Sequence, residues 1–306
     1  MSDTNKALLK LLLFIAPVAI VVLFFEYNLF RMPNSYNFKK NLIEKNAPDI
    51  EMLILGSSHS YNGINPVFLS QKSINMAESS QSLYYDLKIT EKYLDRMKNL
   101  KTVIIPVSYF SLGYNINDND GYWRGYFYEK YYGIACQQHK LDIKRFSFLA
   151  LYGQITGLIY AKENFDPGLA KNITDLGFDR QSSETNYIDE ERAKKQTVYH
   201  ATLIKEKNIP ENIKYLETLI EKLQSKNVRP VLVTTPVYHT YSDNIDKKNY
   251  DLMQKNVNDL VKKYNIKYFN YFTDNRFIDK DFITSDHLNE MGAEKFSKIL
   301  DKDILH

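Results

Sequence analysis

Short apolar runs alternate with amphipathic helical patterns along this chain, and this alternation constrains its fold more than any other feature of the sequence. Five runs read as short buried strands: residues 51–55, 73–74, 102–107, 228–235 and 266–271. Apolar residues recur at helical spacing in the segments 82–100, 212–226 and 250–264. Strands that alternate with helices are joined by right-handed crossovers and form a parallel sheet. We therefore predict an α/β fold of three layers, in which helices cover both faces of a parallel sheet.

The composition is that of a globular protein. The 306 residues are 44% hydrophobic, which is enough apolar material for a large core. A formal net charge of +3 is too small a surplus to indicate nucleic-acid binding. The single cysteine, Cys136, excludes an intrachain disulfide and a cysteine-based zinc site. The six histidines are scattered and no glycine loop is of the phosphate-binding kind, so we expect no metal and no cofactor.

The N-terminal segment is strongly apolar. Residues 7–30 contain two charged side chains, Lys10 and Glu26, and the uncharged stretch 11–25 is about 22 Å long as a helix. We expect residues 1–30 to form an uncleaved transmembrane anchor, with a cleaved signal peptide or a buried core helix as the alternatives. No small-x-small cleavage site follows the apolar run.

The flanking basic residues do not decide the orientation of this anchor. A short N-terminal tail is the usual arrangement when the large domain is exported. We therefore expect a single-pass protein of the cytoplasmic membrane, with its globular domain on the periplasmic or extracellular side.

Between the two halves of the predicted sheet, the rhythm of strands and helices is interrupted. We expect residues 31–50 to be a polar linker and residues 51–306 to form one domain with an aromatic-rich insertion at about 109–201. Seven aromatic residues lie within the segment 121–133 of this insertion. Aromatic rings offer large rigid faces. The cluster therefore reads either as a packed subdomain at one edge of the sheet or as a platform on which sugar rings or acyl chains stack.

Two polar segments carry the candidate chemistry. Gly56-Ser57-Ser58-His59-Ser60 follows the first predicted strand, and ligands of open α/β sheets bind beyond the carboxyl ends of the strands. A glycine before two serines allows a tight turn that exposes a hydroxyl beside amide N–H groups, as a serine nucleophile requires. An ordinary polar turn that caps a helix is the alternative.

The second segment lies about 230 residues later, just before an amphipathic C-terminal helix. It reads Ser285-Asp286-His287-Leu288-Asn289, and a histidine in a loop at the start of a helix is well placed to act as a general base. Taken alone, His287 would more often be a structural histidine.

Together these two segments resemble the first and last blocks of the SGNH hydrolase superfamily, over roughly residues 52–300. The resemblance implies a flavodoxin-like three-layer fold. More narrowly, with its N-terminal span, the chain looks like the membrane-anchored SGNH-like proteins that accompany membrane-bound O-acyltransferases, of the teichoic-acid D-alanyl transfer and alginate O-acetylation types. This implies acyl transfer or ester hydrolysis through a Ser-His(-Asp) site outside the cytoplasmic membrane, with a multispanning O-acyltransferase as partner and a glycan as acceptor.

The resemblance assigns roles to individual residues. It implies that Ser58 is the nucleophile and His287 the base. Ala77 takes the place of the glycine whose N–H usually donates to the oxyanion. The third block, usually Gly-x-Asn-Asp, corresponds here to residues 106–110, so its amide donor is missing or is replaced by Ser108.

The acid of the last block is also altered. The family carries an aspartate three residues before the histidine, and this chain has Thr284 there. Asp286 is the nearest substitute, although adjacent side chains in an extended loop tend to point apart. A Ser-His dyad, or a carboxylate from elsewhere, remains open.

Other polar residues are weaker candidates. His59, beside the nucleophile, and His239, after a predicted strand, read as substrate-contacting residues or as loop anchors. His139, His200 and His306 have no partner that the sequence identifies.

Three functions fit these observations. The first is an acyltransferase component, in which Ser58 is acylated and a glycan hydroxyl resolves the acyl-enzyme. The second is a membrane-tethered carbohydrate esterase, in which water resolves it. The third is a catalytically impaired SGNH-like binding or assembly protein, which the altered blocks keep open as an alternative to the acyltransferase.

Overall fold

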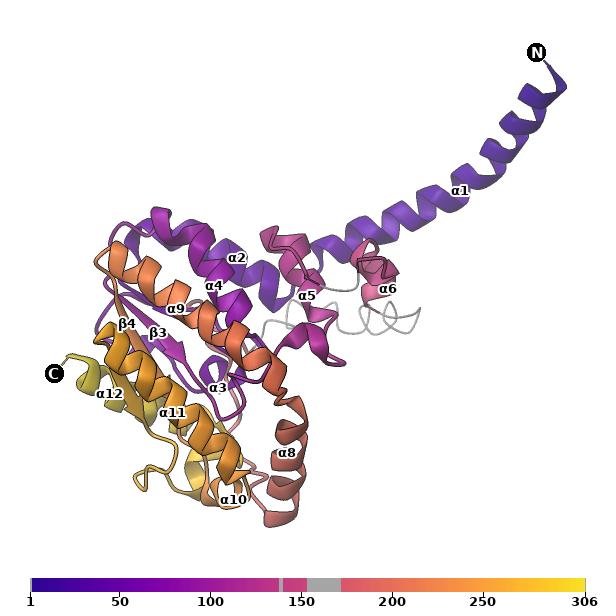
Figure 1. Ribbon diagram of the computed structural model, residues 1–306. Helices are drawn as coiled ribbons and strands as arrows, with labels where there is room; N and C mark the ends of the chain where they lie inside the picture. The colour runs from indigo at the N-terminus through magenta and orange to yellow at the C-terminus, as the bar shows by residue number, and fades with distance from the viewer. Residues whose placement is uncertain (1, 138–139, 153–171, 306) are drawn as a thin grey trace.

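Five parallel strands form the central sheet of the computed structural model, which describes residues 2–137, 140–152 and 172–305 (Figure 1). The strands are β1 (Met52–Ile54), β2 (Ser73–Asn75), β3 (Thr102–Pro106), β4 (Arg229–Thr234) and β5 (Lys267–Asn270). They lie in the order β2-β1-β3-β4-β5, and all four pairings are parallel. This is the flavodoxin-like order of a doubly wound sheet. The predicted α/β fold with a parallel sheet is therefore confirmed.

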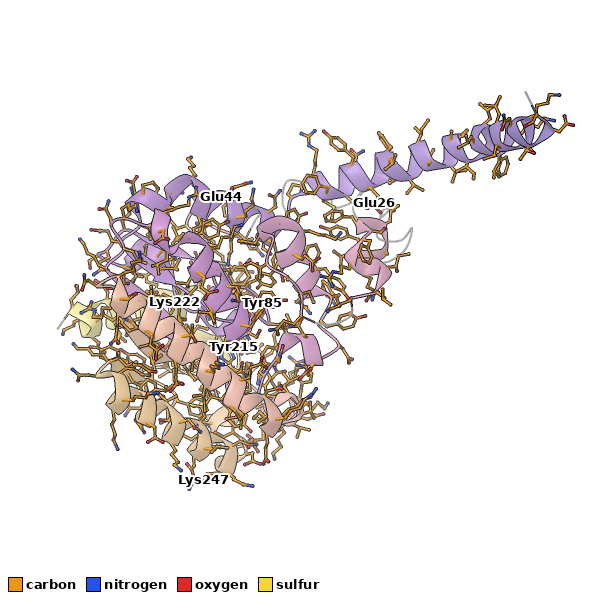
Figure 2. The ribbon with its side chains drawn as sticks, turned by 45° about the horizontal axis from the view of Figure 1, so that its top comes forward. Glu26, Glu44, Tyr85, Tyr215, Lys222 and Lys247 are labelled. Carbon is orange, nitrogen blue, oxygen red and sulfur yellow. The ribbon has the colours of Figure 1, made fainter. Side chains whose placement is uncertain are left out.

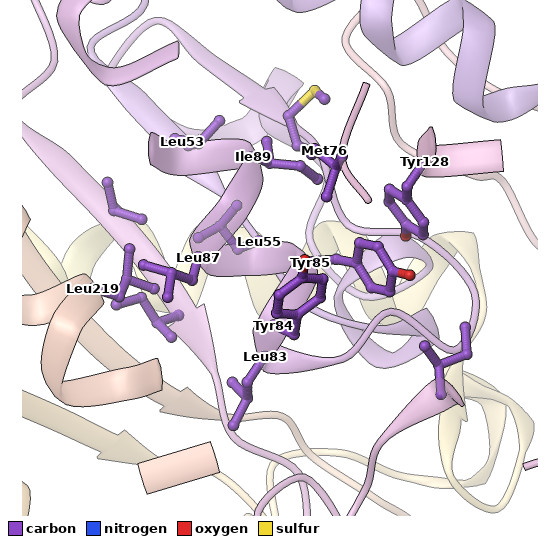
Figure 3. Close-up of a cluster of buried hydrophobic side chains, with 14 of the residues drawn as sticks. Leu53, Leu55, Met76, Leu83, Tyr84, Tyr85, Leu87, Ile89, Tyr128 and Leu219 are labelled. Carbon is purple, nitrogen blue, oxygen red and sulfur yellow. The ribbon is translucent and has the colours of Figure 1, made fainter. Parts of the chain in front are cut away.

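The two faces of the sheet bury alternate residues of each strand. Leu53 and Leu55 enter one apolar cluster, which Figure 3 shows together with Leu219, whereas Met52 and Ile54 enter a second cluster on the opposite face. Helices α4 (Leu83–Tyr93), α9 (Ile209–Ser225) and α11 (Lys247–Tyr264) contribute to the first cluster, and α12 (Glu290–Leu305) to the second. Strands that are covered on both faces appear in a sequence as continuous apolar runs, and this is why they could be predicted.

The N-terminal helix α1 (Asp3–Arg31) projects away from this domain, as Figures 1 and 2 show. It is long and apolar enough to cross a membrane, and its most apolar 18-residue stretch has no buried residue. Pro17 lies inside the helix, a position that membrane helices tolerate. At the domain end, the ring of Phe30 stacks on Tyr131 with 6.0 Å between centroids.

Residues 31–50, which we expected to be a polar linker, contain the helix α2 (Ser35–Asn46). One face of α2 is packed against the domain, where Lys39, Leu42 and Ile43 are buried. The helix is polar overall because its other face is solvated, so the sequence showed no apolar run. The segment that follows α1 is thus part of the domain core.

Part of the insertion forms a packed aromatic layer. Helix α5 (Arg124–Phe127) and a π-helical turn (Tyr128–Tyr132) bury five of the seven aromatic residues of the segment 121–133. Tyr128 stacks on Tyr85 with 3.9 Å between ring centroids, and Phe127 stacks on Tyr36 at 4.9 Å. Of the two interpretations of this cluster, the packed subdomain fits these contacts. Residues 138–139 and 153–171 of the insertion lie outside the described part of the chain.

The other α-helices and strands of the described residues are α3 (Ser58–Tyr61), α6 (Phe148–Leu151), α8 (Glu190–Leu203), α10 (His239–Ser242) and the antiparallel pair β6 (Phe282–Thr284) and β7 (His287–Leu288).

Candidate active site

A glycine turn places the first polar segment at the carboxyl end of β1. Gly56 has a φ of +109°, and a Cβ at this position would lie 2.8 Å from Cγ of Pro106, so glycine is required on both grounds. Its N–H donates to the buried Asp86 carboxylate at 2.9 Å. After the turn, Ser58 is the first residue of α3, and its side chain is partly exposed.

His287 faces Ser58 from the other end of the chain. The two residues are 229 positions apart, and Nε2 of His287 lies 2.8 Å from Oγ of Ser58, a hydrogen-bond distance. The β6-β7 pair presents the histidine, whose side chain is 20% exposed. The structure thus brings together the two residues to which the sequence assigned nucleophile and base.

Asp286 approaches the second ring nitrogen of the same histidine. Its Oδ1 lies 3.1 Å from Nδ1 of His287. The hydroxyl of Thr284 donates to that carboxylate oxygen at 2.9 Å and lies 3.1 Å from Nδ1. Asp286 occupies the turn between β6 and β7 rather than an extended segment, and for this reason adjacent side chains converge here instead of pointing apart.

The other oxygen of Asp286 faces a group of buried side chains. Oδ2 lies 3.5 Å from Nε2 of His59 and 4.0 Å from Nε2 of His200, and Gln196 donates to it at 3.3 Å. Nδ1 of His59 is 2.8 Å from the hydroxyl of Ser108. The predicted residues His59 and Ser108 therefore lie next to the Asp286 carboxylate, and the ring of His59 also meets that of His287 with 4.9 Å between centroids.

Two members of this group were missed by the sequence. His200 and Gln196 lie on α8, one helical turn apart, and their side chains are in contact at 3.0 Å. Tyr241 fixes the other nitrogen of the His200 ring at 2.6 Å. The sequence does place Gln196 and His200 four residues apart, on one face of a helix. Nothing in the sequence indicates that this helix packs against the loop of Asp286.

The charges of these groups differ because of their surroundings. Burial disfavours ionisation of Asp286, but His287 and the two other histidines outweigh it, and the pKa of this carboxyl lies well below its usual range. Burial alone would lower the pKa of His287, and Asp286 reverses this and raises it. Burial lowers the pKa of His59, and it lowers that of His200 to about 3. His287 is thus the histidine of the group that is suited to take up a proton.

The predicted oxyanion donors already have partners. The N–H of Ala77 donates to the side chain of Asn75 at 3.0 Å. The N–H of Ser108 donates to the Ser111 hydroxyl at 2.8 Å, and its own hydroxyl contacts His59. Ser58 begins α3, and the first N–H groups of a helix have no acceptor within the helix, so the Ser58 amide is an alternative donor.

His239 lies apart from this group. Its side chain is largely exposed, contacts Asp243 at 3.5 Å and lines a separate pocket of about 380 Å³ with Val237 and Phe277. No contact joins it to Ser58 or His287 among the described residues.

Ligand atoms of His59, Asp286 and His287 lie within 4.8 Å of one another, which is close enough for a metal ion.

An open pocket of about 280 Å³ adjoins His287. It is lined by Tyr187, Arg192, Ala193, Gln196, Thr284, Ser285, Asp286 and His287. Most of the lining residues have polar side chains, although more of the accessible lining is apolar than polar. The guanidinium of Arg192 lies 4.4 Å from the centroid of the Tyr187 ring. The pocket offers room for a polar group of moderate size beside the imidazole.

Comparison with known proteins gives a limited result. No family profile matches the sequence, and no curated protein sequence is significantly similar to it. Among solved structures, the chain is similar to a GDSL-like lipase from Bacteroides thetaiotaomicron, with 9% identity, a TM-score of 0.42 and coverage of 89% of this chain and 98% of the other. It is also similar to a lipase/acylhydrolase from Enterococcus faecalis, with 11% identity, a TM-score of 0.39 and coverage of 83% and 95%. Both scores are below 0.5, so any assignment of function has to come from the site of this chain.

Proposed function

We propose that this protein is a serine-dependent acyl-transfer enzyme of SGNH type, with Ser58 as nucleophile and His287 as general base. The observation that carries the proposal is the 2.8 Å contact between Oγ of Ser58 and Nε2 of His287. Asp286 supports it, because an ionised carboxylate beside Nδ1 holds the imidazole in position and stabilises its protonated form.

The reaction follows from this geometry. Ser58 Oγ attacks the carbonyl carbon of an ester while its proton passes to Nε2 of His287. The tetrahedral intermediate collapses, and the imidazolium returns the proton to the leaving alcohol. A second hydroxyl then attacks the acyl carbonyl carbon and gives its proton to His287. The bond between this carbon and Oγ of Ser58 breaks, the imidazolium returns the proton to Oγ, and the new ester leaves. With water as the attacking group, the same steps give ester hydrolysis.

The finer proposal is that α1 anchors the enzyme in the cytoplasmic membrane and that the acyl group, an acetyl group in the simplest case, passes to a surface or exported glycan. It is supported by the apolar length of α1, and by the pocket beside His287, whose polar side chains could contact sugar hydroxyls. The resemblance to anchored SGNH-like proteins further suggests a multispanning O-acyltransferase as acyl donor. A transferase would have to stay close to a membrane-bound acyl donor, whereas an esterase would not. Anchoring by α1 therefore favours transfer over hydrolysis.

The first test uses Ser58→Ala, with Ser57→Ala as a matched control. The hydroxyl of Ser57 makes no capping bond to α3, so its loss should be tolerated. We expect Ser58→Ala to abolish labelling by a fluorophosphonate probe and to lower p-nitrophenyl acetate hydrolysis on the order of 10³-fold or more. Equal labelling of the two variants would contradict the assignment of the nucleophile.

A second candidate is an SGNH-like binding or assembly protein without catalysis. It is favoured by the partners that the Ala77 and Ser108 N–H groups already have. Glycan acylation in cells that carry Ser58→Ala separates the two functions. Native acylation in those cells would support the assembly protein, and its loss with the protein still folded and anchored would support the enzyme.

A further inference from the structure

A loop beside the base of α1 exposes three apolar side chains within six residues. Leu141, Ile143 and Phe146 are 95%, 68% and 70% exposed. Single exposed apolar side chains are ordinary on protein surfaces, but several together on one short segment are typical of a binding surface. We call residues 141–146 the apolar loop.

The loop is tied to α1 through Glu26. This residue lies at the domain end of α1, above α6, as Figure 2 shows. Its carboxylate accepts hydrogen bonds from the N–H groups of Phe148 at 2.7 Å and Leu149 at 3.2 Å, and from the Ser147 hydroxyl. Because α6 follows the apolar loop directly, these bonds hold the loop at the level of Glu26 on α1.

That level matches a membrane surface. On the N-terminal side of Glu26, α1 presents exposed apolar side chains such as Phe24. On its C-terminal side, Arg31 donates to the hydroxyl of Tyr27 at 3.0 Å. Aromatic and basic side chains of this kind gather where a membrane helix leaves the apolar core of the bilayer. The apolar loop therefore lies at the depth of the interface.

We propose that the apolar loop inserts into the interfacial region of the bilayer that α1 crosses, as a second lipid contact of the domain. The proposal rests on the part of the proposed function in which α1 is an anchor. Lys140 and Lys144 lie on or next to the loop, and their charges suit anionic headgroups. A single helix leaves the domain free to turn about the helix axis, whereas two contacts fix which side of the domain faces the membrane.

The test places a tryptophan at three positions of the full chain, one at a time. The variants are Phe146→Trp in the loop, Leu13→Trp in α1 and Val198→Trp on α8. Leu13 and Val198 are both largely exposed. Each variant is reconstituted in phosphatidylcholine/phosphatidylglycerol vesicles, with or without bromine on the acyl chains, and its emission is compared with that of the parent chain, which contains Trp123.

We expect brominated lipid to quench Phe146→Trp and Leu13→Trp beyond the parent, and to leave Val198→Trp at the parent level. Quenching of Leu13→Trp without quenching of Phe146→Trp would overturn the proposal. The same result is expected if the apolar loop binds a protein instead of lipid. No quenching of Leu13→Trp would overturn both the anchor and the loop contact. Hydrolysis of a soluble ester by the same variants reports on Ser58 separately, so a failure of the proposed chemistry remains distinguishable.

Discussion

The carboxylate of Asp286 is shared between two sets of side chains. On one oxygen it meets Thr284 and the base His287, and on the other it faces His59 and His200. An ion so deeply buried, with only 3% of the residue exposed, is costly unless polar partners surround it. His287 on Oδ1, together with His59 and His200 on the side of Oδ2, keeps the pKa of Asp286 low, and Gln196 donates to Oδ2 at 3.3 Å. The carboxylate is thereby held ionised beside His287.

Replacing Asp286 by asparagine should change both the rate and its dependence on pH. The general base acts only when it is neutral, and Asp286 raises the pKa of His287, so native activity should rise with pH through a value above 6.5. In Asp286→Asn, the carboxylate no longer opposes the effect of burial, which lowers the pKa of His287. The rise of activity with pH should therefore move to lower pH. The rate at its plateau should fall on the order of 10³ to 10⁴-fold because the tautomer is no longer fixed.

The measurement is kcat/KM for a soluble ester over the range from about pH 5 to 9. A small loss with an unmoved limb would show that Ser58 and His287 act as a dyad. Asp281→Asn is a suitable comparison, since it removes a buried carboxylate in a short turn before β6 that bonds Lys295 instead of the site.

Thr284 stands where the resemblance implied an aspartate, and its hydroxyl connects the acid to the base. Thr284→Val keeps the shape of the side chain and removes one hydrogen bond to a charged group, so we expect kcat to fall about tenfold with little change in KM. Thr284→Ser should retain most of the activity. If valine and serine behave alike in steady-state assays, the hydroxyl has no part in orienting His287.

Helix α2 links α1 to the loop that carries Ala77. Lys39 is fully buried on α2, donates to the Ala77 carbonyl and lies 3.6 Å from the centroid of the Tyr61 ring. Burial lowers the pKa of Lys39 to about 8, against the nearby carboxylates Glu78 and Asp179, which raise it. A helix in the segment that the sequence predicted to be a linker thereby fixes the peptide of Ala77 and Glu78, whose N–H donates to the Gly56 carbonyl at 3.0 Å.

Lys39→Met should make the stability of the protein more dependent on pH. Burial already raises the pKa of Glu78, and Lys39 lowers it, so removing the lysine raises this pKa further. A carboxyl whose pKa is raised by folding binds its proton more tightly in the folded state, so its contribution to stability is lost as pH rises through that pKa. As pH rises through the pKa of Glu78, the free energy of unfolding of the variant should therefore fall further than that of the native chain. We expect the additional fall to be about 1.4 kcal/mol for each unit by which the substitution raises this pKa.

Denaturant unfolding at acidic and at neutral pH measures this effect. Lys40→Met is the matched control, since Lys40 pairs with Glu44 on the partly exposed face of α2. Adding Glu78→Gln to Lys39→Met should remove the extra pH dependence. If the double variant keeps it, Glu78 is not the group responsible.

For the molecule as a whole, the sequence predicted the sheet better than the site around it. Buried parallel strands are short apolar runs, and β1 to β4 are mostly buried, whereas β5 at the edge of the sheet is partly exposed. All five strands appear in the structure close to their predicted positions. Ser58 could be found because it follows the first predicted strand, and His287 because it lies just before the C-terminal helix. His200 could not, because its contact with Asp286 depends on how α8 folds back over the last loop. No pattern of apolar residues in the insertion predicts that α8 packs against this loop.

The packing of α2 also determines where this protein can be cut for expression without its first helix. A fragment that begins at residue 51 would lack Ile43 and Lys39, leaving a void in the core and an unsupported Ala77 carbonyl. Asn34 caps α2 by accepting from the N–H of Asn37 at 2.9 Å, so it has to be retained. A version without α1 for crystallisation should therefore start just after Arg31, and its yield and melting temperature should exceed those of the shorter fragment.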